Sequence, residues 1–167
     1  AKGAKIVSYD RSIKSPDLDV YVSHDAFKVG VIEAEEAVKA TGGKGNYVIL
    51  DGQSGHSVVA EIDRGYMSVL KPLIDKGDIK IVVQKNHESW SPEQSLRTME
   101  DAIAKTKGDI QAILANNSGM ARGAVQAIQA GNLGDKKIFI AGSDTDAANM
   151  NYVCEGKQSI EVLKDIK

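Results

Sequence analysis

Two adjacent charged residues, Asp10 and Arg11, follow a short apolar run near the start of the chain. A carboxylate beside a planar guanidinium can hold neighbouring hydroxyl groups, because the carboxylate accepts hydrogen bonds and the guanidinium donates several from a fixed fork. The same pair is also typical of a local ion pair that binds nothing. The residue types therefore leave a polyol-binding site and a structural salt bridge open.

The only tryptophan, Trp90, stands directly before Ser91-Pro92, a sequence typical of a helix start. An indole in such an entry loop offers a flat apolar face for the C–H surface of a sugar ring, or it packs against its own helix. Asn117 and Asp144 supply amide and carboxylate groups of the kind that sugar hydroxyls require. Either residue could instead simply cap the helix that follows it.

The three histidines, His24, His56 and His87, all lie near the ends of predicted strands. Together with Asp25 or Asp51 they could form a metal site. None of them shows the paired spacing that places two ligands on one helix face. We therefore expect loop histidines or histidines at the edge of a ligand site, and we predict no bound metal and no cofactor.

Three patterns are similar to catalytic or phosphate-binding motifs but are incomplete. Asp51, Asp144 and Asp146 could belong to a phosphate-accepting receiver site, but the acidic pair needed at an earlier strand end does not fit. Ser54 lacks the Gly-x-Ser-x-Gly pattern of a nucleophile elbow. The glycine-rich stretch at 42–46 follows a helix and precedes a strand, the reverse of a phosphate loop. We predict a protein that is not an enzyme, and keep an enzyme of either kind as a less favoured hypothesis.

These side chains need elements that bring them together, and the apolar pattern supplies them. The predicted strands cover 5–9, 19–23, 47–50, 79–83, 110–115, 138–141 and 159–163, and the predicted helices cover 26–40, 58–75, a segment from 91, 120–130 and 147–154. Strands that alternate with helices indicate an α/β fold with an open, doubly wound parallel sheet and helices on both faces. The carboxyl ends of such strands lie along one edge, where ligands bind.

Bulk properties exclude several classes of protein. The chain has 167 residues, 42% of them hydrophobic, and a net charge of −2 without a basic stripe, so we predict no nucleic-acid partner. No apolar run is long enough to span a membrane, and the first residues do not form a signal peptide. The single Cys154 cannot form an internal disulfide, and we expect it in the core.

The motifs together resemble the xylose-binding branch of the periplasmic sugar-binding proteins. The resemblance covers nearly the whole chain, and its strength lies in the order and spacing of motifs that are modest one by one. The motifs are Ile6-Val7-Ser8-Tyr9-Asp10-Arg11, Ser23-His24-Asp25 with Lys28-Val29-Gly30, Trp90-Ser91-Pro92-Glu93, Ala115-Asn116-Asn117 with Gly123-Ala124-Val125-Gln126-Ala127, Gly142-Ser143-Asp144-Thr145-Asp146 and Val162-Leu163-Lys164.

The resemblance implies a role for each candidate residue. Asp10 and Arg11 would bind sugar hydroxyls from a first lobe, Trp90 would stack on the ring, Asn117 and Asp144 would hydrogen-bond to it, and Lys164 would lie near the hinge.

Two departures from the family pattern bear on the ligand. His56 and Ser57 replace part of a polar stretch, which makes them possible ligand-binding residues and leaves the choice of pentose or hexose open. Ser118 replaces an aspartate, which would remove a charge near a helix start.

The resemblance also implies a division of the chain into parts of a two-lobed protein. Residues 1–24 would be a residual first-lobe strand and crossover, residues 25–144 a complete second lobe, and residues 145–167 a segment that returns to the first lobe. We interpret the chain as a truncated form and expect it to bind sugar weakly or not at all by itself. The strands at 5–9 and 159–163 would expose unpaired edges, so we expect them to be loosely ordered, to pair with each other or to recruit a second copy.

The implied function is the non-catalytic binding of a monosaccharide, D-xylose or a related aldopentose or hexose, outside the cytoplasm. Its expected partner is the permease of an ABC sugar importer or a membrane sensor kinase. The alternative is the effector-binding core of a sugar-responsive transcription regulator, a class that shares this fold. An upstream signal peptide would favour the first hypothesis, and an upstream DNA-binding headpiece the second.

Overall fold

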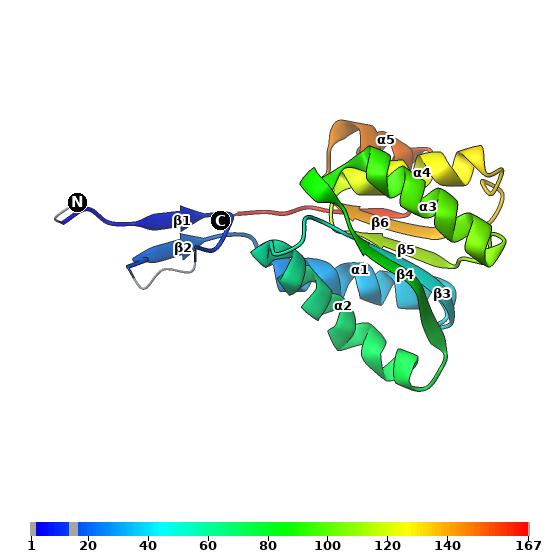
Figure 1. Ribbon diagram of the computed structural model, residues 1–167, viewed down its shortest axis with the longest axis horizontal. Helices are drawn as coiled ribbons and strands as arrows, with labels where there is room; N and C mark the ends of the chain where they lie inside the picture. Colours follow the sequence, from blue (N-terminus) through cyan, green and yellow to red (C-terminus); the bar gives the residue numbers. More distant parts are fainter. Residues whose placement is uncertain (1–2, 14–16, 167) are drawn as a thin grey trace.

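The protein has two parts in the computed structural model, which describes residues 3–13 and 17–166. The smaller part is a ribbon of two parallel strands, β1 (Val7–Tyr9) and β2 (Val20–Val22), with Val7 opposite Val20. The larger part is a three-layer body from which this ribbon projects (Figure 1).

The larger body is built on a five-stranded parallel sheet with the order β4-β3-β5-β6-β7. Its strands are β3 (Gly45–Asp51), β4 (Ile79–Asn86), β5 (Ala112–Ala115), β6 (Phe139–Ser143) and β7 (Ile160–Val162). The helices are α1 (Ala26–Thr41) and α2 (Ser57–Asp75) on one face, and α3 (Pro92–Thr106), α4 (Ser118–Ala130) and α5 (Ala147–Cys154) on the other (Figure 1). The predicted fold class, an α/β parallel sheet with helices on both faces, is confirmed.

Strand β3 shows why the sequence folds in this way. Its four central residues are fully buried and alternate between two hydrophobic clusters. Tyr47 and Ile49 join the cluster that includes α1 and α2, whereas Val48 and Leu50 join the cluster that includes α3 and α4. A strand covered on both faces needs such an unbroken apolar run.

The order of the strands reverses at β3, which lies between β4 and β5. At such a switch point the loops after the two central strands separate, and ligands of open α/β sheets bind there. Here Gly52, after β3, donates its N–H to Asn116 Oδ1, after β5, at 2.9 Å. The two loops are therefore joined at the point where the topology places a site.

The C-terminal strand differs from expectation. The prediction that residues 159–163 form an unpaired first-lobe strand is wrong, because β7 pairs with β6, with Ser143 opposite Val162. The crossover through α5 simply adds one more parallel strand to the same sheet. The last described residues then run toward the ribbon (Figure 1). Cys154, predicted in the core, is exposed at the end of α5. The wider division of the chain at residues 24 and 144 stays a prediction.

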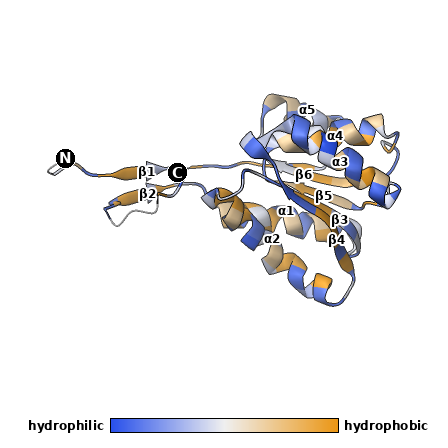
Figure 2. Ribbon diagram, in the orientation of Figure 1, coloured by the Kyte–Doolittle hydropathy of each residue, from blue (hydrophilic) through white to orange (hydrophobic). Residues whose placement is uncertain are grey.

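The ribbon carries apolar side chains that nothing in the described part of the chain covers. Val7, Tyr9, Val20 and Tyr21 are between 45% and 66% exposed, and Figure 2 shows both strands as hydrophobic. No helix within residues 3–13 and 17–166 has both the length and the apolar character that crossing a membrane requires.

Candidate functional site

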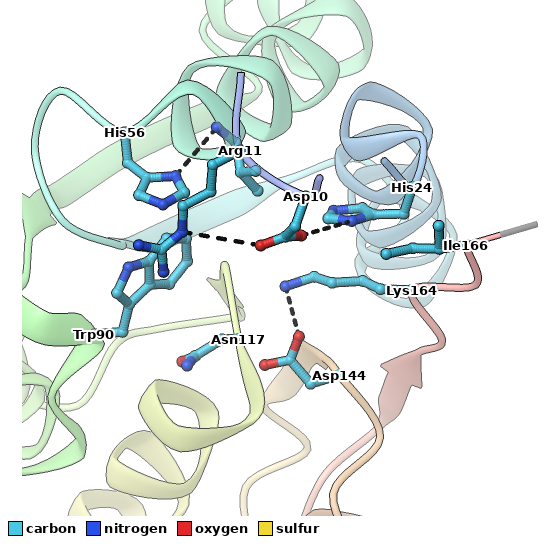
Figure 3. A pocket seen from close by; sticks show the side chains of 10 residues that line it. Asp10, Arg11, His24, His56, Trp90, Asn117, Asp144, Lys164 and Ile166 are labelled. Carbon is cyan, nitrogen blue, oxygen red and sulfur yellow. Dashed lines mark hydrogen bonds and ion pairs between the residues drawn. The ribbon is translucent and has the colours of Figure 1, made fainter. Parts of the chain in front are cut away.

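A cavity of about 320 Å³ lies where the ribbon meets the carboxyl edge of the sheet (Figure 3). Its lining consists of Asp10, Arg11, His24, His56, Val58, Trp90, Asn117, Asp144, Lys164 and Ile166. The cavity thus brings together Asp10, Arg11, Trp90, Asn117 and Asp144, as the sequence predicts, and Lys164 and His56 line it as well. Their role in binding a ligand stays a prediction. Ser57 lines the neighbouring hollow instead, and its Oγ accepts a hydrogen bond from Ser12 N at 3.3 Å.

Two cations of the cavity each face a carboxylate. Lys164 Nζ lies 2.8 Å from Asp144 Oδ1 and also donates to the backbone oxygen of Asn116 at 3.0 Å. Arg11 Nε lies 3.9 Å from Asp10 Oδ2. The side chain of Lys164 is only 13% exposed, so these two contacts fix the position of its ammonium group. The cavity therefore carries balanced charge.

Two histidines of the cavity are neutral at pH 7. Burial lowers the pKa of His24, and Lys164 lowers it further. Burial likewise lowers the pKa of His56, with Arg11 contributing in the same direction. His56 Nδ1 accepts a hydrogen bond from Val58 N at 3.3 Å, which caps α2 and places the ring proton on Nε2. The His56 ring lies edge-to-face with Trp90, with ring centroids 5.3 Å apart.

Trp90 is held by the loop between β4 and α3, which forms a short 3₁₀ helix, η1 (Glu88–Trp90). Its indole packs so closely on Gly52 that a Cβ at Gly52 would overlap the ring. His87 fixes this loop to the sheet and to α3. Its Nδ1 lies 2.9 Å from the backbone oxygen of Asp51, and its Nε2 lies 3.0 Å from Thr98 Oγ1. His87 is fully buried, so it is a structural residue.

The helix start predicted after Trp90 is present with one difference. Ser91 Oγ accepts a hydrogen bond from Gln94 N at 3.2 Å, as an N-cap should. A capping box would turn the Gln94 side chain back to the cap residue, but its Oε1 accepts from Glu88 N at 3.1 Å instead. This contact ties the start of α3 to the turn that carries Trp90.

Three of the predicted ligand residues adopt backbone conformations that are unusual for residues other than glycine. The φ angles of Asp10, Trp90 and Asp144 are 65°, 56° and 112°. Such conformations cost about 1–3 kcal/mol each and cluster at binding and catalytic sites. The sequence contains no signal for them, because none of these positions is a glycine.

Asn117 caps a helix and also lies at the cavity, so capping does not exclude the predicted ligand role. Its Oδ1 accepts a hydrogen bond from Met120 N at 2.9 Å and thereby caps α4. Its side chain also lines the cavity, which leaves the Nδ2 group available as a donor (Figure 3). Helix capping therefore fixes the orientation in which the amide faces a ligand.

Sequence reasoning missed a buried polar chain beneath the cavity. Asn116 Nδ2 donates to the Tyr66 hydroxyl at 3.4 Å, and that hydroxyl donates to Glu33 Oε2 at 2.6 Å. Burial raises the pKa of Glu33 to about 8, so this carboxyl is protonated at pH 7. The only signal in the sequence was the position of Asn116 beside Asn117.

A buried carboxyl, Asp51, lies at the end of β3 near the half-buried carboxyl of Asp63. Gln84 Nε2 donates to Asp51 Oδ2 at 2.9 Å. Burial raises the pKa of both carboxyls, that of Asp63 to about 8. Asp51 is thus engaged in holding β3 and β4 together. Within residues 3–13 and 17–166, no group of three or more histidine, cysteine or acidic residues could hold a metal ion.

Comparison with known proteins shows the family to which the chain belongs. The model of a periplasmic binding protein domain family matches residues 1–167. The D-xylose-binding periplasmic proteins of Haemophilus influenzae and Escherichia coli are 38% and 36% identical to this chain over 165 residues, 99% of this chain and 49% of each relative. A periplasmic solute binding protein of an ABC transporter from Actinobacillus succinogenes, solved with bound D-allose, is 30% identical with a TM-score of 0.82, and the match covers 92% of this chain and 54% of that one. The chain therefore spans about half the length of the curated relatives it matches.

Proposed function

Because the chain belongs to the periplasmic binding protein domain family, a family of non-catalytic binding domains, we propose that its cavity binds a neutral monosaccharide of the D-xylose type. One observation carries the proposal. An indole face, an amide, two carboxylates and two cations from five separate loops line a single cavity of about 320 Å³. Polar groups that converge beside one aromatic face are the usual means of orienting a small ligand.

The balance of charge favours a neutral ligand over a sugar acid or a sugar phosphate. Lys164 is paired with Asp144, and Arg11 faces Asp10, so neither cation is left for an anionic group. The neutral histidines add no charge of their own. An anionic ligand would have to displace one of the carboxylates from its partner, at the cost of an uncompensated charge.

The family also indicates the setting. The relatives from Haemophilus influenzae and Escherichia coli are periplasmic proteins, and the relative from Actinobacillus succinogenes belongs to an ABC transporter. We propose the same extracytoplasmic location and an ABC permease, or a membrane sensor kinase, as the partner that receives the sugar-loaded protein.

The chain by itself should bind its sugar weakly. A clamshell site gains affinity by enclosing the ligand and excluding water. The chain spans only half the length of its relatives, and one side of the cavity is formed by a two-stranded ribbon. We expect a dissociation constant for D-xylose near the millimolar range, or about 4 kcal/mol of binding free energy at 1 mM.

The test is an NMR titration of the chain with D-xylose. Binding should shift the signals of the Trp90 indole N–H and the Asn117 side-chain amide, and the variant Trp90→Ala should abolish the effect. The anion D-xylonate, of matched size, should produce no comparable shifts. A site that binds D-xylonate as well as D-xylose, or a complete lack of shifts at high D-xylose concentration, would contradict the proposal.

The exposed apolar side chains of the ribbon suggest a second, weaker interaction. We propose that two copies associate through β1 and β2 when nothing else covers them, because a two-stranded ribbon leaves its outer edges unpaired. Light scattering should show a mass that rises with concentration, and Tyr9→Lys should reduce that rise. A strictly monomeric chain at all concentrations would contradict self-association without affecting the sugar proposal.

A further inference from the structure

Glu161, in the edge strand β7, accepts hydrogen bonds from three separate segments. Its Oε2 accepts from Ser118 Oγ at 2.8 Å and from Thr145 N at 3.0 Å, and its Oε1 accepts from Gln158 Nε2 at 2.7 Å. Every one of these contacts is a donor facing a carboxylate oxygen, the stronger class of hydrogen bond. Glu161 does not line the cavity, and the proposed sugar site does not require it as a ligand.

The neighbouring strand makes room for this side chain. Glu161 lies opposite Gly142 in the register of β6 and β7. A Cβ at Gly142 would overlap Glu161 Oε1, so only glycine leaves the path across β6 open. The carboxylate thereby reaches the loops at the carboxyl ends of β5 and β6, which carry Asn117 and Asp144.

One of these contacts holds a strained turn. Asp144 and Thr145 have φ angles of 112° and 60°, a conformation that residues with side chains rarely adopt. The Thr145 N–H donates to Glu161, and the Asp144 N–H donates to the Val162 oxygen at 3.1 Å. These bonds fix the turn in which the Asp144 carboxylate faces the cavity and pairs with Lys164 (Figure 3).

The other contact holds the start of α4. Ser118 is the first residue of that helix and follows Asn117 directly. Besides its bond to Glu161, Ser118 Oγ shares its proton with the Ser143 oxygen at 3.1 Å. A negative charge at a helix N-terminus is favourable, because the helix dipole is positive there. The cap that orients the Asn117 amide therefore rests on the same carboxylate as the Asp144 turn.

We propose that Glu161 is a positioning residue that fixes Asn117 and Asp144 relative to each other, so that their spacing matches one arrangement of ligand hydroxyl groups. The proposal rests on the proposed function, since it concerns the same cavity. The surroundings support it. Asn149 Nδ2 donates both to the Ser118 oxygen at 2.8 Å and to Gln158 Oε1 at 2.9 Å, and Asn149 and Gln158 are buried. These donors and acceptors form one connected hydrogen-bond network around Glu161.

These hydrogen bonds make Glu161→Gln a direct test of the positioning role. A glutamine has the same length but only one acceptor oxygen, and its NH₂ group must face either Gln158 Nε2 or Thr145 N, both of which donate. We expect hydrogen exchange of the Thr145 amide to accelerate about 10-fold or more. The carbon signal of the Asp144 carboxyl and the Asn117 side-chain amide signals should move as well. Glu155→Gln is the matched control, because it removes the same charge from an ion pair with Lys157 and should leave all three signals unchanged.

The double variant Glu161→Gln with Gln158→Glu exchanges the donor and the acceptor between the two positions. It should restore part of the Thr145 protection and of the Asp144 signal, because the bond from Gln158 Nε2 to the Ile160 backbone oxygen is still lost. The restored part is expected because the new amide at position 161 can donate to the new carboxylate at position 158 and still accept from Thr145 N. A purely structural loss of packing would not be rescued by this exchange.

Several outcomes would overturn the proposal. Unchanged Thr145, Asp144 and Asn117 signals in Glu161→Gln would do so, as would a double variant no better than the single one. If Glu161→Gln does not fold, the wild-type protein still decides, because a Thr145 amide that exchanges at the rate of an unprotected amide contradicts the hydrogen bond.

The D-xylose titration separates this proposal from the functional one. If the wild-type chain binds and Glu161→Gln binds at least about 10-fold more weakly while Glu155→Gln is unaffected, both stand. If D-xylose shifts no signal in the wild type, the functional proposal fails for this chain, and the three NMR signals still test the positioning role.

Discussion

Asp10 and Asp144 present carboxylates to the same cavity from very different supports. Asp10 follows β1 in a ribbon of two strands, whose neighbouring apolar side chains are largely exposed. Asp144 follows β6, an interior strand between β5 and β7 of the five-stranded sheet, beside the hydrogen bonds of Glu161. One wall of the site is therefore fixed by a packed core, and the other wall by a few hydrogen bonds.

The difference suggests how the two walls contribute to binding. The sheet carries Trp90, Asn117 and Asp144, which are held by packing on Gly52, by a helix cap and by the Glu161 carboxylate, respectively. Because these groups are already ordered, they lose little conformational entropy when a ligand binds. The Asp10 N–H donates to the Val22 oxygen at 2.8 Å, and its own backbone oxygen accepts from Ser23 Oγ at 3.0 Å. Ordering the ribbon side is the larger cost, which a covering partner would reduce.

Hydrogen exchange should reveal the largest contrast between the two parts. Amides of Leu50 and Leu114 lie in the buried centre of the sheet and should exchange only when the whole domain unfolds. The amides of Asp10 and Val20 bond across the ribbon, to the Val22 and Ile6 backbone oxygens, and should exchange through local opening, with protection at least about 10³-fold lower than that of the sheet amides. Equal protection in both parts would show that the ribbon folds cooperatively with the sheet, and the two sides of the cavity would then be equally rigid.

The variant Gly52→Ala tests the sheet-borne wall by displacing Trp90. The added Cβ overlaps the indole, so the ring must leave its position or the backbone must move, at a cost of up to about 3 kcal/mol in stability. Because Trp90 is the only tryptophan, its fluorescence spectrum should shift and the D-xylose response should be lost. Gly134→Ala is the control, since a Cβ there meets nothing within 4 Å. An unshifted emission spectrum in Gly52→Ala would contradict the packing.

The sheet-borne wall was largely readable from the sequence. The apolar runs at β3 to β6 and the polar residues behind them predict the edge at which Trp90, Asn117 and Asp144 meet. Strands that are covered by helices on both faces need continuous apolar runs, so these strands can be recognised in the sequence without knowledge of their contacts. The placement of 159–163 failed because a parallel strand at the sheet edge and an orphan strand have the same short apolar sequence.

The supporting polar residues could not be predicted. Glu33, Asn116 and Glu161 occupy positions that a helical or strand pattern treats as ordinary polar sites, yet Glu33 and Asn116 are fully buried. The sequence suggested that Ser118 removes a charge from the start of α4, but the structure places the Glu161 carboxylate against Ser118. Such contacts join residues 43 positions apart, and no local pattern encodes them.

Between pH 6.5 and 8 the pH dependence of stability should come from the sheet part. The folded protein holds the Glu33 proton up to about pH 8, whereas the unfolded chain loses it near the ordinary value of 4.5. The free energy of unfolding therefore falls as pH rises between these values, by about 2 kcal/mol from pH 6.5 to 8 for this one group. The histidines, whose pKa values are lowered in the folded protein, act weakly in the opposite direction just above their ordinary value of 6.5, because only the unfolded chain still binds their protons there.

Urea unfolding of Glu33→Gln against wild type measures this slope. The variant should lose about 2 kcal/mol less than wild type between pH 6.5 and 8, and the remaining slope should come from Asp63, whose pKa is also raised to about 8. Glu36→Gln, on the same helix but exposed and 3.6 Å from Lys39, should run parallel to wild type. Parallel curves for Glu33→Gln and wild type would show that Glu33 is ionised in the folded protein.

The smallest effect is expected from the ribbon's own ion pair. Asp19 accepts from Lys5 Nζ at 2.8 Å and from Ile6 N at 2.8 Å, and its pKa is lowered chiefly by the Lys5 contact. The pair is exposed, and Asp19→Asn removes the charge while keeping an acceptor for Ile6 N. Exchange of the ribbon amides should therefore rise less than about threefold. In 1 M salt, where charges are screened beyond about 3 Å, the variant and the wild type should become indistinguishable. A rise in exchange rate above tenfold would mean that this one surface ion pair orders the ribbon that carries Asp10. The ribbon would then be held by an ion pair as firmly as the sheet is held by its core.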